Sequence, residues 1–211
     1  MPEHLDFTEA ATLPCAAVTA YSALEGVGPG DTVLVQGSGG VSLFALQLAR
    51  VAGARVIATT SSEKKAARLR ELGASDVVNY RDTPEWGDEV RRLTGGQGAD
   101  VIVEVGGAGT IAQSIKAAAY RGTISLVGHV TLGGDAEHAS LDEVLLALTY
   151  NMTSVRAIGG GSRSDLEDMN RVITAHQLHP VIDRVFPFEE ALDAASHLRS
   201  GAHFGKVVIS H

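Results

Sequence analysis

Hydrophobic positions along this chain follow two spacings that alternate with each other. Short, nearly continuous apolar runs rich in β-branched residues are followed by stretches in which apolar residues recur every three or four positions. The first pattern is typical of buried strands and the second of amphipathic helices. The pattern predicts strands at residues 32–35, 55–59, 76–79, 101–105, 123–127 and 154–158.

Helices are predicted between these strands, at residues 62–72, 84–93, 110–119 and 141–150, and apolar residues from Val41 to Ala52 predict one after the first strand. Residues 3–26 are also predicted to be helical, with a break at Pro14. Strands that are apolar on both faces are typical of a parallel sheet covered by helices on both sides. The sequence therefore predicts an α/β fold, a Rossmann doubly wound parallel sheet of six strands with helices on both faces.

The last part of the chain departs from this repeat. A helix is predicted at residues 165–176, followed by a strand-helix-strand extension at 181–186, 189–199 and 206–209. Its two strands could extend the main sheet or pair with something outside the chain. We divide the chain into lead-in helices (1–30), a dinucleotide-binding domain (31–178) and a C-terminal segment (179–211).

A glycine-rich turn, Gly37-Ser38-Gly39-Gly40, connects the first strand to the next helix. Such a turn lets backbone N–H groups approach a ligand, and the helix N-terminus adds unpaired N–H groups and partial positive charge. The motif nearly matches G-x-G-x-x-G, with Ser42 at the third position, where a small residue lets the helix pack on the strand. We predict that the turn binds a phosphate group; a tight turn without a ligand is the alternative.

The end of the second predicted strand indicates which dinucleotide would bind. An acidic residue there accepts hydrogen bonds from the ribose of NAD, whereas small and basic residues leave room for a 2′-phosphate. No carboxylate occurs before Glu63, while Thr60 and Ser61 are small and Lys65 is a cation one helical turn later. This combination favours NADP(H) over NAD(H). The alternative is that Ser62 only caps the helix and the lysines are solvated.

Composition narrows the class of protein further. A net charge of −8 argues against nonspecific binding to nucleic acid or to an anionic membrane. No apolar run approaches membrane-spanning length, and the N-terminal residues do not form a signal peptide. The single cysteine excludes an internal disulfide and fits a reducing compartment. We expect a soluble cytoplasmic protein.

Several motifs occur in an order that resembles a known superfamily. They are LPCAAVTAYSAL, PGDTVLVQGSGGVSLFALQLA, VIATTSSEKK, LGASDVVNY, GADVIVEVGG and HFGKVVI. From about Thr8 to Ile209 the chain resembles the medium-chain dehydrogenase/reductase superfamily, and within it the alcohol dehydrogenase-like and quinone oxidoreductase-like members. The resemblance implies hydride transfer between NADP(H) and an alcohol, carbonyl or quinone-like substrate.

The resemblance also implies a cofactor site. Gly39, Gly40 and Val41 would cradle the pyrophosphate, and Ser61 and Lys65 would hold the 2′-phosphate. Tyr80 would lie beside the adenosine, unless it is a half-buried packing residue, and Thr19 would lie near the nicotinamide. The ends of strands four to six would line the nicotinamide pocket largely through backbone atoms. The expected contact residues are Thr19, Gly37, Ser38, Gly39, Gly40, Val41, Thr60, Ser61, Lys65, Tyr80, Val105, Gly106, Val127, Gly128, His129, Ile158, Gly159 and Gly160.

Members of the superfamily are longer than this chain and carry an N-terminal GroES-like domain with most substrate contacts and, in zinc enzymes, most metal ligands. We therefore interpret this chain as the cofactor domain, whose C-terminal segment packs on that other domain in relatives. Cys15 stands where zinc-dependent relatives take one ligand from this domain. Catalytic zinc needs about three protein ligands, so no zinc is expected here. We assign no catalytic residue, because hydride transfer needs mainly positioning; His129 could donate a proton or merely line the pocket.

Three hypotheses follow. The first is the cofactor domain of an NADP(H)-dependent oxidoreductase, and the second is a non-catalytic nucleotide-binding module with the same fold. A methyltransferase with a related fold is the third, but it would need an acidic residue at the end of the second strand. We also expect a homodimer through the edge of the sixth strand, because residues 154–158 lack the proline or inward charges that would block an edge.

Overall fold

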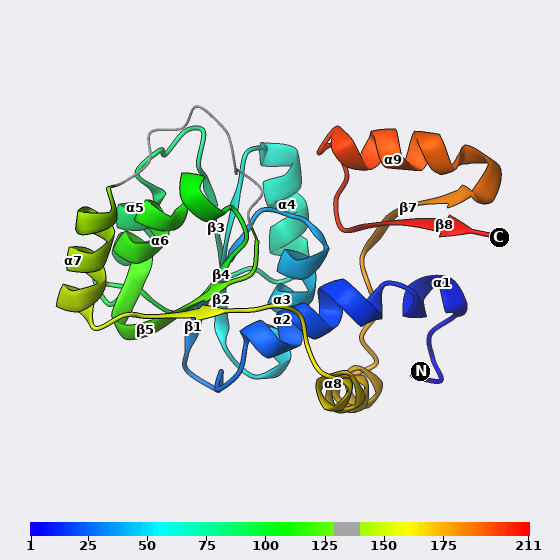
Figure 1. The fold of residues 1–211 in the computed structure, drawn as a ribbon, viewed down its shortest axis with the longest axis horizontal. Helices are drawn as coiled ribbons and strands as arrows, with labels where there is room; N and C mark the ends of the chain where they lie inside the picture. The colour runs from blue at the N-terminus through cyan, green and yellow to red at the C-terminus, as the bar shows by residue number, and fades with distance from the viewer. Residues whose placement is uncertain (129–139) are drawn as a thin grey trace.

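The structure, a computed structural model, describes residues 1–128 and 140–211 and is built around a parallel β-sheet (Figure 1). The sheet contains β1 (Thr32–Gln36), β2 (Arg55–Thr60), β3 (Asp76–Asn79), β4 (Ala99–Glu104), β5 (Ala118–Leu126) and β6 (Ser154–Ala157). All neighbouring strands are parallel, in the order β3-β2-β1-β4-β5-β6. This is the Rossmann order, in which the direction of strand addition reverses between β1 and β4. The predicted fold class is confirmed.

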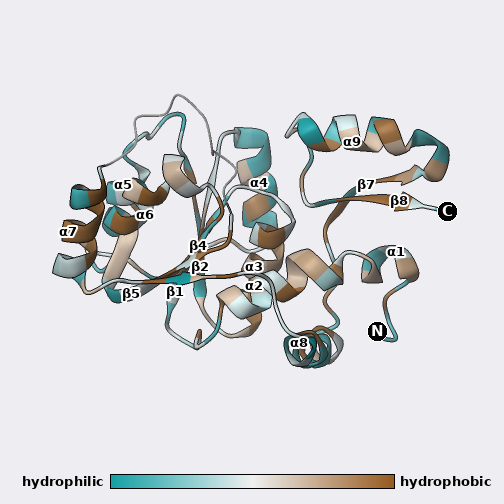
Figure 2. Ribbon diagram, viewed as in Figure 1, coloured by the Kyte–Doolittle hydropathy of each residue, from teal (hydrophilic) through white to brown (hydrophobic). Residues whose placement is uncertain are grey.

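Helices cover both faces of the sheet, because successive residues of each strand point to opposite sides. Val33 and Val35 of β1 belong to a hydrophobic cluster with residues of α2 (Val18–Ala23), α3 (Gly40–Val51), α4 (Glu63–Glu71) and α8 (Arg163–Ala175). Leu34, between them, belongs to a second cluster, with residues of α5 (Trp86–Leu93) and α6 (Ile111–Ala117), against which α7 (Leu141–Asn151) packs. Hydrophobic and hydrophilic residues alternate along the helices, as expected for helices that bury one side (Figure 2).

The connection between β4 and β5 differs in detail from the prediction. A short 3-10 helix, η2 (Gly107–Gly109), precedes α6, and β5 begins at Ala118, directly after α6 ends. The expected helix at 110–119 is therefore shorter. The β4–β5 register shifts between Ala99 and Val101, and Arg121 adopts a φ of 64°. The extra residues at the start of β5 are accommodated by this shift in register.

The lead-in segment consists of α1 (Phe7–Ala10), a π-helical turn η1 (Leu13–Ala17) and α2. Pro14 lies in the first turn of η1, where its missing N–H removes no helical hydrogen bond. The predicted break therefore falls just before Pro14. Asp6 caps α1 through a capping box with Glu9.

The C-terminal segment forms a unit of its own, which stands to one side of the main sheet (Figure 1). It consists of β7 (Ile182–Pro187), η3 (Phe188–Glu190), α9 (Ala191–Arg199) and β8 (Lys206–Ser210). β7 and β8 pair with each other in parallel, an arrangement that neither sequence alternative described. We call residues 182–210 the C-terminal unit.

Among the residues described, no helix is both long enough and apolar enough to cross a membrane.

Candidate functional site

The glycine turn after β1 presents backbone groups toward open space. Gly37 has a φ of 73°, which favours glycine, and its N–H donates to the Thr59 carbonyl at 2.9 Å, joining the ends of β1 and β2. Gly39 is the N-cap of α3 and provides no side chain to occupy the first N–H groups of the helix. A Cβ built on Gly37 or Gly39 would meet no atom within 4 Å. The turn therefore has both the donors and the room that a phosphate needs.

Ser42 occupies the position of the third glycine in the motif and fits there. It is buried in the first turn of α3, and its hydroxyl donates to the Gln36 carbonyl at 2.6 Å. The side chain is small enough for the helix to approach β1, and its one polar atom is satisfied.

A buried polar network lies where the sheet order reverses. The Glu104 carboxylate, at the end of β4, has no exposed surface and accepts a hydrogen bond from Gln36 Nε2 at 2.8 Å. It also accepts the N–H groups of Gly106 and Gly107 at 2.8 and 2.9 Å. Thr110 Oγ1 donates to it at 2.5 Å, and Ser114 Oγ donates as well. Sequence analysis gave this residue no role, although a lone acid at the end of an apolar strand was a visible signal.

The end of β2 holds the residues expected to select the cofactor. Thr60 is buried and Ser61 is half-buried. The Tyr80 N–H donates to the Thr60 carbonyl at 2.9 Å, and its side chain is 42% exposed, so Tyr80 stands beside this strand end with its ring accessible. Ser62 is the N-cap of α4, but its hydroxyl accepts no hydrogen bond from the helix. The idea that Ser62 caps through its side chain is therefore wrong.

Lys65 is engaged with the C-terminal unit and is not freely solvated. Its Nζ donates to the carbonyl oxygens of Gly201 and His203 at 2.8 and 2.9 Å. Burial lowers the pKa of Lys65, a shift that Asp183 partly opposes and Arg68 reinforces. The alternative of a solvated Lys65 is thus wrong, whereas Lys64 is exposed.

The ends of β4, β5 and β6 lie on the other side of the point where the strand order reverses, which is the position of the ligand crevice in doubly wound sheets. The Glu104 carbonyl accepts the N–H groups of Val127 and Gly128 at 2.8 and 3.3 Å. A Cβ on Gly128 would lie 2.6 Å from the Val105 carbonyl, so these two strand ends approach as closely as glycine allows. The Ile158 N–H donates to the Leu126 carbonyl at 2.9 Å, so a backbone hydrogen bond joins the ends of β5 and β6 in the same way.

The remaining expected contact residues lie on α2, on α3 and after β6. Gly159 and Gly160 follow the end of β6, and Gly160 has a φ of 115°. Thr19 is buried in α2, where its hydroxyl donates to the Cys15 carbonyl at 2.7 Å. Val41 is half-buried in the first turn of α3. His129 lies outside the described residues.

Lys206 is a cation near the glycine turn that sequence analysis did not single out. A Cβ built on Gly40 would lie 2.5 Å from Lys206 Cδ, so the aliphatic stem of this lysine covers the glycine. The Gly205 N–H donates to the Ser38 carbonyl at 2.8 Å. The C-terminal unit therefore touches the turn itself.

The described residues do not assemble a zinc site. The Cys15 thiol is exposed on η1, and residues 1–128 and 140–211 contain no group of three or more His, Cys, Asp or Glu side chains that could hold a metal ion. Because zinc needs about three protein ligands, these residues alone do not fit it.

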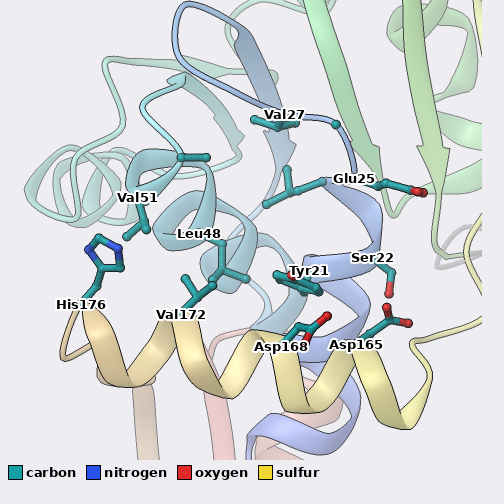
Figure 3. A pocket seen from close by; sticks show the side chains of 13 residues that line it. Tyr21, Ser22, Glu25, Val27, Leu48, Val51, Asp165, Asp168, Val172 and His176 are labelled. Carbon is teal, nitrogen blue, oxygen red and sulfur yellow. The ribbon is translucent and has the colours of Figure 1, made fainter.

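A separate hollow of about 540 Å³ lies between α2, the end of α3 and α8 (Figure 3). It is lined by Leu48 and Val51, at the opposite end of α3 from the glycine turn, about 17 Å along the helix. Its acidic side chains already have partners: Asp165 belongs to the capping box of Ser162, Asp168 pairs with Arg171, and Glu25 pairs with Arg156. Because it lies at the far end of α3, this hollow is not part of the crevice at the strand ends.

Comparison with known proteins gives a consistent result. Residues 40–175 match the family of zinc-binding dehydrogenases. A zinc-type alcohol dehydrogenase-like protein of Schizosaccharomyces pombe is 43% identical over 213 residues, which cover 99% of this chain and 61% of that protein.

Solved structures show the same fold over the whole chain. An NAD-dependent alcohol dehydrogenase has a TM-score of 0.89 at 38% identity, over 100% of this chain and 60% of that one. The quinone oxidoreductase of Coxiella burnetii has a TM-score of 0.78 at 30% identity, over 99% and 62%. The chain thus spans about 60% of the length of these relatives.

Proposed function

Because this chain belongs to the zinc-binding dehydrogenase family of the medium-chain dehydrogenase/reductase superfamily, we propose that it binds NADP(H) for hydride transfer to or from an alcohol, carbonyl or quinone substrate. Within that superfamily it is a nucleotide-binding domain. The observation that carries the proposal is the glycine turn at the N-terminus of α3, which has room beside Gly37 and Gly39 and lies next to the point where the sheet order reverses. Dinucleotides bind at this position in doubly wound sheets.

The choice of NADP(H) rests on the end of β2. Thr60 and Ser61 offer no carboxylate that would repel a 2′-phosphate. The Lys65 ammonium has three N–H donors, and two of them are held by the carbonyls of Gly201 and His203. This fixes the position of the charge next to the expected 2′-phosphate, and the third donor can serve that group.

The protein's own part in hydride transfer is to bind and orient. When bound, the nicotinamide supplies the hydride chemistry. The glycine turn and the α3 N-terminus would hold the pyrophosphate, and the strand ends at Val105–Gly106 and Val127–Gly128 would border the nicotinamide. Backbone groups would fix its orientation there, and Gly128 lies close to the Val105 carbonyl at this place.

A non-catalytic nucleotide-binding module is the second candidate. Such a module would keep the fold and the glycine turn and would bind the cofactor without turnover.

We also propose a homodimer through the edge of β6. This strand is the last in the sheet order, and Val155 is 44% exposed on it. Arg156, the charged residue of the strand, turns back to form an ion pair with Glu25. The edge therefore presents backbone groups without a charge that would repel a second copy.

Titration with NADPH and NADH, followed by turnover with a panel of carbonyls and quinones, tests the function. Tighter binding of NADPH together with turnover supports the oxidoreductase. Binding without turnover supports the second candidate, and binding of neither cofactor contradicts both.

A further inference from the structure

Glu104 links three elements of the crevice that are far apart in the sequence. Its side chain reaches Gln36 at the end of β1, and its backbone carbonyl accepts the N–H groups of Val127 and Gly128 at the end of β5. Its carboxylate also holds the N–H groups of Gly106 and Gly107, which begin the loop after β4.

The donors around this carboxylate divide between its two oxygens. Oε1 accepts from Gly106, Gly107 and Thr110, and Oε2 accepts from Gln36 and Ser114. Gln36 Nε2 also donates to Ser114 Oγ at 2.7 Å, which leaves the serine proton for Glu104. The five groups around the side chain can all donate to it, and together they satisfy both carboxyl oxygens.

A fully buried carboxylate is costly unless hydrogen bonds replace its hydration. An apolar side chain at this point would satisfy the packing of β4 equally well, but it could not bind the two loop N–H groups. The specific effect of the carboxylate is to fix the backbone of Gly106 and Gly107 against the sheet.

The two halves of a dinucleotide bind on opposite sides of the β1–β4 boundary. The adenosine half lies over β1 to β3, where the end of β2 meets its ribose, and the other half lies over β4 to β6. The loop that Glu104 holds is therefore on the nicotinamide side. We propose that Glu104 is a positioning residue for the nicotinamide half of the cofactor site, acting through the backbone of Gly106 and Gly107.

This inference rests on the proposed function, and the experiment separates the two. The ligands are NADPH and 2′-phospho-ADP-ribose, which lacks only the nicotinamide. Binding of both to the wild-type chain is measured by calorimetry, and the fluorescence of bound NADPH reports how its nicotinamide ring is held. If the wild-type chain binds neither ligand, the proposed function fails and this inference fails with it.

The main variant is Glu104→Gln, which has the same shape. Its amide oxygen can still face Gly106 and Gly107 while its NH₂ faces Gln36 Nε2 and Ser114 Oγ, but the negative charge is lost in either orientation. The hydrogen bonds to the loop N–H groups therefore become weaker, neutral ones. We expect the affinity for NADPH to fall about tenfold more than the affinity for 2′-phospho-ADP-ribose, with a smaller fluorescence change per bound NADPH.

Thr110→Val keeps the carboxylate and removes only one donor on the Oε1 side, so it carries the test if Glu104→Gln does not fold. We expect a smaller loss in the same direction. Ile173→Val in α8 is the control for a general loss of stability, because Ile173 is buried and far from the loop. It should lower the melting temperature and leave the ratio of the two affinities unchanged.

An unchanged ratio of the NADPH affinity to the 2′-phospho-ADP-ribose affinity in both Glu104→Gln and Thr110→Val would overturn the proposal. A selective loss for NADPH that Ile173→Val does not reproduce would support it, because a purely structural role affects both ligands alike.

Discussion

The N–H group of Gly205 donates to the carbonyl of Ser38 at 2.8 Å, although 167 positions separate the two residues (205 − 38). Gly39 and Gly205 form an isolated parallel bridge at the same place. The C-terminal unit is thus hydrogen-bonded to the glycine turn proposed to hold the pyrophosphate. Substitutions in this unit should therefore change the affinity of the proposed cofactor site for its ligand.

Replacing Gly205 by alanine tests this contact. Gly205 has a φ of 94°, and a Cβ there would lie 2.2 Å from the Val181 carbonyl, so the backbone must shift. We expect a loss of about 2 kcal/mol in the free energy of unfolding, measured by urea denaturation, and weaker binding of NADPH and NADH alike. Gly95→Ala is the matched control, because Gly95 has a φ of 64° but no atom within 4 Å of a Cβ and has no part in the proposed site. Unchanged cofactor binding in Gly205→Ala would show that the contact does not matter to the turn.

Lys65→Ala should weaken the binding of NADPH more than the binding of NADH. The ammonium is held at the end of β2 by two carbonyls, where a 2′-phosphate would lie. A charge-assisted hydrogen bond of this kind contributes about 1.5–3 kcal/mol, or roughly a tenfold or larger change in the dissociation constant. Lys64→Ala, at the exposed neighbour, should leave both constants unchanged. Equal losses for NADPH and NADH in Lys65→Ala would remove this lysine from the phosphate site.

His203 should make the protein less stable in mild acid. Burial, followed by the nearby charge of Lys65, lowers the pKa of His203 below its ordinary value of 6.5. The folded state therefore binds this proton more weakly than the unfolded chain, and stability falls as the pH drops from 6.5 toward the folded-state pKa. Urea unfolding at about pH 7.5 and about pH 5.5 should show a smaller difference in His203→Gln than in the wild type. The exposed His176 provides the control substitution, His176→Gln; an equal flattening there would contradict the assignment to His203.

Val155→Lys should prevent dimer formation through β6. A lysine on an edge strand opposes pairing with a second copy, because it brings like charges together across the two-fold axis. Val185→Lys is a control of equal exposure, since both valines are 44% exposed, on β6 and β7 respectively. Sedimentation at micromolar concentration should show a dimer for the wild type and Val185→Lys, and a monomer for Val155→Lys. A monomeric wild type would refute the dimer itself.

Local patterns were sufficient to predict the sheet. The strands are buried on both faces, so each is an apolar run that can be recognised without its neighbours, and the glycine turn has a conformation that its own residues impose. For this reason the order of the strands, the helices on both faces and the turn at Gly37 agree between sequence and structure, whereas β5 begins at Ala118, before its predicted start at residue 123. Family motifs in the correct order extended the prediction to the cofactor domain.

Contacts between distant segments were decided only by the tertiary structure. Glu104 and Gln36 are 68 residues apart, and Lys65 meets carbonyls 136 and 138 residues away. The pairing of β7 with β8 likewise depends on where α9 returns the chain. A buried carboxylate or a flexible lysine has no periodicity that reveals its partners, because its donors and acceptors come from whichever backbone the packing brings near. The sequence by itself therefore determined the fold and the place of the glycine turn, and the packing of remote segments determined which side chains lie around that turn.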